Sequence, residues 1–86
     1  MKYLVEFWVK EPYAENLKKV YEIEAGRQKK GEAFTGHTQY NFLSEPHAIM
    51  IVDCEPHKIA KWCKEYVAVM GYKISPLMER TEMEKL

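Results

Sequence analysis

Leu4-Val5-Glu6-Phe7-Trp8-Val9, followed by Glu11-Pro12, has the same order of features as Ala48-Ile49-Met50-Ile51-Val52, followed by Glu55-Pro56. Each run is a strand-like stretch of β-branched, aromatic and other apolar residues, and each ends shortly before a Glu-Pro pair. Proline suits the first turn of a helix, because the N–H that it lacks would have no partner there. The second run follows the first at about half the length of the 86-residue chain. The sequence therefore indicates two copies of one strand–helix unit.

Each copy of the unit needs a further strand to complete it. We expect strands over residues 2–9, 37–43, 48–54 and 72–78, and helices that begin at Pro12 and Pro56. The first helix ends at Gly26 or Gly31 and the second at Gly71, because glycine takes the left-handed conformation that ends a helix. This order predicts a ferredoxin-like α+β sandwich, β-α-β-β-α-β, in one domain over residues 1–86. We expect strand order 4-1-3-2, two helices on one face, and Pro76 on an edge strand.

Composition limits the classes of partner. Thirteen basic residues balance thirteen acidic ones, so the chain lacks the positive field that attracts nucleic acid or an anionic membrane. No stretch of about eighteen apolar residues is present, which excludes a membrane-spanning helix. Charged residues within the first six positions argue against a signal peptide. We therefore expect a cytoplasmic protein in which Cys54 and Cys63 are reduced.

Alternation along the strands predicts which side chains face the helices. The odd residues of the first strand, from Tyr3 to Val9, are all apolar or aromatic, whereas the even residues include Glu6. If Leu43 pairs with Ala48 across the hairpin, cross-strand partners share a face and set the remaining pairs. The predicted pairs are Asn41 with Met50, Gln39 with Val52, and His37 with Cys54, while Tyr40, Phe42, Ile49 and Ile51 lie beneath the helices.

The opposite face of the predicted sheet is mixed in polarity. It carries large apolar side chains such as Trp8 together with the carboxylate of Glu6, a mixture that is typical of an interface or a walled pocket. We expect a homodimer whose sheets face each other, and a pocket for a small apolar or aromatic molecule, or an interaction surface. The predicted ligand-binding or interface residues are Glu6, Trp8, His37, Gln39, Asn41, Met50, Val52 and Ser75.

A second hypothesis is an enzyme. Glu6 lies in the middle of a central strand, where burial would raise its pKa and make it a general base, and His37 is a further acid–base candidate. His37 and Cys54 supply too few ligands for a metal site, and no glycine-rich phosphate loop is present. We therefore expect no metal and no cofactor. The alternative function is a cofactor-independent monooxygenase or isomerase.

The second half of the chain resembles a known family. The segment from Glu55-Pro56 through Ala60-Lys61-Trp62 to Tyr72-Lys73-Ile74-Ser75-Pro76-Leu77 is similar to an uncharacterised family of short dimeric α+β-barrel proteins, a domain of unknown function. The resemblance implies a ferredoxin-like protomer and a dimer, and it implies no catalytic residue. The wider dimeric α+β-barrel superfamily, which includes cofactor-less monooxygenases and muconolactone isomerase-like proteins, is similar at the level of fold only.

Overall fold

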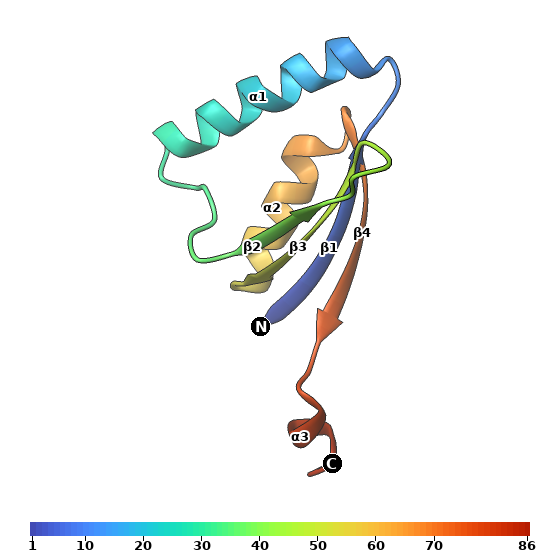
Figure 1. Ribbon diagram of the computed structural model, residues 1–86. Coiled ribbons are helices and arrows are strands. Elements are labelled where there is room, and N and C mark those ends of the chain that lie inside the picture. Colours follow the sequence, from blue (N-terminus) through green and yellow to red (C-terminus); the bar gives the residue numbers. More distant parts are fainter.

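The computed structural model describes residues 1–86 and contains a four-stranded antiparallel sheet with two helices against one face (Figure 1). The sheet order is β2-β3-β1-β4, which is the expected order read from the opposite edge. The predicted ferredoxin-like α+β fold is confirmed. The elements are β1 (Lys2–Val9), α1 (Tyr13–Lys29), β2 (Thr38–Asn41), β3 (His47–Asp53), α2 (Pro56–Tyr66), β4 (Met70–Leu77) and α3 (Arg80–Met83).

The core lies between the sheet and α2. The odd residues of β1 face the helices as predicted, and Val5 is completely buried. The ring of Trp62 on α2 packs edge-on against Phe7, with 5.9 Å between the ring centroids, and lies 4.9 Å from the ring of Tyr66. The core cluster comprises Tyr3, Val5, Val20, Met50, Val52, Ile59, Trp62, Tyr66, Val69 and Met70.

The prediction for the faces of β3 is wrong. Tyr3 pairs with Val52 and Val5 with Met50, so the even residues of β3 share the helix-covered face with the odd residues of β1. Met50 and Val52 are therefore buried in the core instead of lying on the open face. Ala48 is also buried, and Cys54 packs against the core instead of facing outward.

The hairpin register differs from the predicted one by two residues. Gln39 pairs with Met50 and Asn41 with Ala48. The odd residues of β2 therefore share a face with the even residues of β3, as predicted, but this face lies toward the helices and not on the open side. The side chains of Gln39 and Asn41 consequently lie on the helix side of the sheet, and His37 lies on the same side. The residues expected beneath the helices, Tyr40, Phe42, Ile49 and Ile51, do not lie in the core.

Gly71 does not end a helix. Helix α2 stops at Tyr66, and Gly71 pairs with Trp8 inside β4, which begins at Met70. A Cβ at this position would lie 2.3 Å from two atoms of the Trp8 indole. The glycine therefore serves a close side-chain approach within the sheet. Pro76 lies on β4, which is an edge strand as predicted.

Helix α1 packs loosely compared with α2. It continues past Gly26 to Lys29, and Gly31 follows in the left-handed conformation with φ of 70°, as in the second of the two expected ends. Most of its side chains are exposed, and Figure 1 shows the helix crossing the far end of the sheet on the side of α2. The residues after β4 extend away from the sheet and end in α3 (Figure 1). None of the three helices combines the length and apolar character that a membrane span requires.

Candidate functional site

A cleft of about 550 Å³ lies beneath α1, between this helix and the β2–β3 hairpin. This volume falls within the usual range of small-molecule sites, roughly 300–1,000 Å³. Of the 24 residues around the cleft, 15 are hydrophobic, and the wall offers both apolar and polar contacts. The cleft lies on the helix side of the sheet, whereas the sequence placed a pocket on the open face.

One wall of the cleft is a mainly apolar stripe of α1. Leu17, Val20, Tyr21 and Glu24 recur at helical spacing and line the cleft. Only Val20 among them is buried, and Tyr21 remains 61% exposed. The helix therefore directs its apolar stripe at open space, where a closed core would have covered it.

The floor of the cleft is apolar and aromatic. β1 contributes Phe7, β3 contributes Ala48 and Met50, and α2 contributes Trp62 and Tyr66. The last four of these residues are buried in the structure and hold their rings and side chains in fixed positions. A flat apolar molecule would find preformed contacts there.

The wall opposite α1 is polar. His37, Gln39 and Asn41 line the cleft at every second position, because alternate residues of a strand share a face. The Gln39 side-chain amide donates a hydrogen bond to Oδ1 of Asn41 at 2.9 Å. This bond leaves the Gln39 carbonyl oxygen and the Asn41 amide group free for other partners. The ring of Phe34 lies beside His37, 6.4 Å between centroids.

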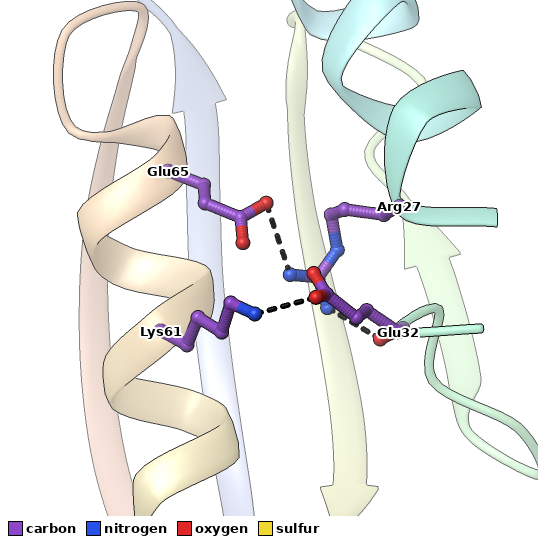
Figure 2. Close-up of polar contacts among 4 residues, drawn as sticks. All are labelled: Arg27, Glu32, Lys61 and Glu65. Carbon is purple, nitrogen blue, oxygen red and sulfur yellow. Dashed lines mark hydrogen bonds and ion pairs between the residues drawn. The ribbon is translucent and has the colours of Figure 1, made fainter. Parts of the chain in front are cut away.

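A buried arginine closes the end of the cleft near the C-terminus of α1. Arg27 is only 5% exposed, and its guanidinium lies 3.3 Å from a carboxylate oxygen of Glu65 on α2. It also donates a hydrogen bond to the backbone carbonyl of Glu32 at 2.8 Å. The carboxylate of Glu32 in turn accepts a bond from Lys61, which holds the pKa of Glu32 below its usual value. Figure 2 shows how these four side chains join α1 and the loop after it to α2.

The N-terminal end of α1 is held separately. The buried side chain of Asn16 donates a hydrogen bond to the backbone carbonyl of Lys10 at 3.0 Å. Both ends of α1 are therefore fixed by polar contacts, and its middle spans the cleft. Between its ends, Val20 reaches the core and Ile23 packs against it.

Two titratable groups at the cleft are perturbed. Burial raises the pKa of Glu24 on the α1 wall, and this carboxylate has no ion-pair or hydrogen-bond partner. Burial also raises the pKa of the Tyr66 phenol to about 12, and the negative charge of Glu24 acts in the same direction. Glu24 therefore lies close enough to the floor of the cleft for its charge to act on the phenol of Tyr66.

A second cluster extends from the edge of the cleft to the open face of the sheet, and its members Trp8, Phe42 and His47 also line the cleft. Glu6 and His47 form a contact of 2.9 Å between a carboxylate oxygen and ring Nε2. The His47 ring stacks on Phe42 at 4.8 Å and lies 5.1 Å from Trp8. His47 was not among the predicted site residues, because Glu6 is distant from it in sequence and only the β1–β3 register brings the two side chains together.

The predicted site residues separate into three places. Glu6, Trp8 and Ser75 lie on the open face, although Trp8 also reaches the rim of the cleft. His37, Gln39, Asn41 and Met50 line the cleft, and Val52 is enclosed in the core. Glu6 and His37 consequently do not share one acid–base pocket. Glu24, Arg27 and Phe34 line the cleft but were not among the site residues predicted from the sequence.

No group of three or more His, Cys, Asp or Glu side chains is arranged to hold a metal ion.

A comparison with curated proteins found no match to the chain. The model of a family described as a domain of unknown function, DUF3303, matches residues 1–86. The expected resemblance to an uncharacterised family is thus confirmed, and the chain belongs to the DUF3303 family.

Proposed function

We propose that the chain binds a small, mainly apolar or aromatic molecule in the cleft beneath α1. The observation that supports this function is the orientation of the α1 stripe, which faces an open volume of about 550 Å³ with Tyr21 largely uncovered. Exposed apolar surface is costly in water, at roughly 25 cal/mol per Å². An occupant that covers this stripe recovers that cost.

The polar groups of the cleft fit the same role. Binding sites for small molecules are mainly apolar, with a few polar groups that set the orientation of the ligand. His37, Gln39 and Asn41 supply such groups along the wall that β2 forms. The arrangement favours a flat ligand with an apolar body and a polar edge that is directed at β2.

An amide NMR titration with naphthalenemethanol, a neutral flat probe, tests this proposal. We expect saturable shifts of the Gln39 and Asn41 side-chain amides, which lie on the cleft wall. Gln39→Phe fills the cleft and should weaken binding by at least about tenfold. Thr38→Phe is the matched control, because Thr38 lies on the same strand with its side chain on the opposite face. Equal binding by both variants, or no binding to the unaltered chain, would contradict the proposal.

We also propose that two copies associate through the open face of the sheet. Trp8, Ile51 and Leu77 are each more than a third exposed there, and Tyr40 is 56% exposed. Strands of 8, 4, 7 and 8 residues give a projected face of roughly 430 Å². A standard interface buries about 800 Å² of accessible surface on each partner. The exposed Met78, Met83 and Leu86 of the C-terminal segment offer further apolar surface for this interface.

Analytical ultracentrifugation tests the dimer. Ile51→Lys places an ammonium in the centre of the open face and should shift the protein from dimer to monomer. Ala25→Lys introduces the same charge on the exposed side of α1 and should leave the dimer intact. A monomeric unaltered chain at micromolar concentrations would refute this assembly.

A further inference from the structure

The charged groups of the cleft do not balance. Arg27 is already neutralised by Glu65, which lies outside the cleft lining. Glu24 on the α1 wall has no partner, and Glu45 at the end of the hairpin adds a second negative charge near the opening. Glu24 and Glu45 are thus the charged lining residues without an ion-pair partner, and eight of the 24 lining residues are Phe, Trp or Tyr.

We infer that the cleft takes a flat aromatic molecule that carries a protonated amine, with Glu24 as its counter-ion. This inference rests on the proposed binding function and adds the charge of the ligand to it. An ammonium beside Glu24 supplies the partner that this carboxylate lacks, and an anionic ligand would be repelled by it.

The aromatic lining favours a cation at the same place. Aromatic rings attract cations to their faces through the negative potential of the π system. The Arg27 guanidinium already uses this property, because it lies 5.3 Å from the centroid of Phe34 and 6.0 Å from that of Tyr66. Tyr21, one turn before Glu24 on the same helix, adds a further exposed ring to the cleft.

The raised pKa of Glu24 supports the inference independently of the lining. Its cause is partial burial, so the carboxylate has lost part of its hydration without gaining a protein partner. A bound cation favours the charged form of this carboxylate, and the pKa of Glu24 should therefore fall when the ligand binds. On the facing wall, the free Gln39 carbonyl oxygen is an acceptor for a second N–H of the ligand.

The test compares naphthylmethylamine with the neutral naphthalenemethanol, two probes of nearly equal shape. We expect the amine to bind the unaltered chain about fivefold tighter than the alcohol, the upper range for a partly exposed ion pair. Glu24→Gln should remove this preference and leave the affinity for the alcohol unchanged. Glu22→Gln, an equal charge change at an exposed position of α1 outside the cleft, should preserve it.

The outcomes separate this inference from the proposed function. If the alcohol binds in the cleft but the amine gains nothing, or if Glu24→Gln keeps the preference, the cationic ligand is wrong and the binding function stands. If Glu22→Gln and Glu24→Gln lose the preference equally, the effect is a general charge effect and the counter-ion assignment is wrong. If neither probe binds, both proposals fail. Thermal unfolding of each variant verifies that the fold is retained.

Discussion

Gly71→Ala should destabilise the protein, although Gly→Ala in an extended strand is normally favourable. A methyl group at this position would lie 2.3 Å from Cε2 and Nε1 of the Trp8 indole and 2.5 Å from Cζ2. Unstrained carbon–carbon contacts lie at about 3.5–4.0 Å. The indole must therefore move by more than about 1 Å, and the rigid ring cannot do so by a small torsion.

The expected size of the effect follows from competing terms. Replacing a glycine with a compatible φ gains about 0.4–1 kcal/mol through the unfolded chain. Overpacking costs about 1–3 kcal/mol, and displacement of Trp8 also weakens its contact with the His47 ring, a pair worth about 0.5–1.5 kcal/mol. Because Trp8 is 37% exposed, it can swing toward solvent and relieve part of the clash. We expect a net loss of about 1–2 kcal/mol.

Urea unfolding, followed by circular dichroism, measures this loss. Gly26→Ala in α1 is the control, because nothing lies within 4 Å of the added Cβ, and this variant should gain about 0.5–1 kcal/mol. In a Trp8→Ala background, Gly71→Ala should change from unfavourable to neutral or favourable. The reasoning is refuted if Gly71→Ala stabilises the unaltered chain as Gly26→Ala does, or if its cost is the same without the indole.

Two further predictions concern the end of the cleft. Arg27→Met leaves the Glu65 carboxylate and the Glu32 carbonyl without their donor and should cost about 2–3 kcal/mol in urea unfolding. Arg80→Met, whose side chain is 91% exposed, should stay within about 0.5 kcal/mol of the unaltered chain; equal effects would contradict the role of Arg27. Burial raises the pKa of Tyr66 from 10.0 to about 12 in the folded protein, so the unfolded chain loses this proton first. The stabilisation of the folded state by the neutral phenol is therefore fully present below pH 10 and is lost as pH rises through 12. The unaltered chain should therefore lose up to about 2 kcal/mol more than Tyr66→Phe between pH 10 and 12, and equal losses would disprove this linkage.

The sequence predicted the architecture because its signals were redundant. Two Glu-Pro pairs opened two helices, and β1 had one wholly apolar side and one mixed side, which fixed its orientation toward the helices. Strand β3 offered no such contrast, because Ala48-Ile49-Met50-Ile51-Val52 is apolar on both faces. Alternation then carries no information, and the aromatic residues of β2 favoured the wrong face.

The predicted end of the second helix was wrong for a different reason. Gly71 follows an apparent helix and was interpreted as its end, a common use of glycine. The structure uses it for the approach of Trp8, a residue more than sixty positions earlier in the chain. No local pattern distinguishes these two uses, because the second depends on the pairing of β1 with β4.

The reversed face of the hairpin and the existence of the cleft have one cause. Had the ring of Tyr40 faced the helices, it would have occupied space beneath α1 that is now open. The observed register places the short polar side chains of Gln39 and Asn41 there, opposite an apolar helical stripe that they cannot cover. Stability alone does not favour amides at positions where an apolar side chain would bury the stripe, and such departures from local packing rules are expected at functional sites. The register that reversed the predicted faces is thus also the one that leaves the cleft open.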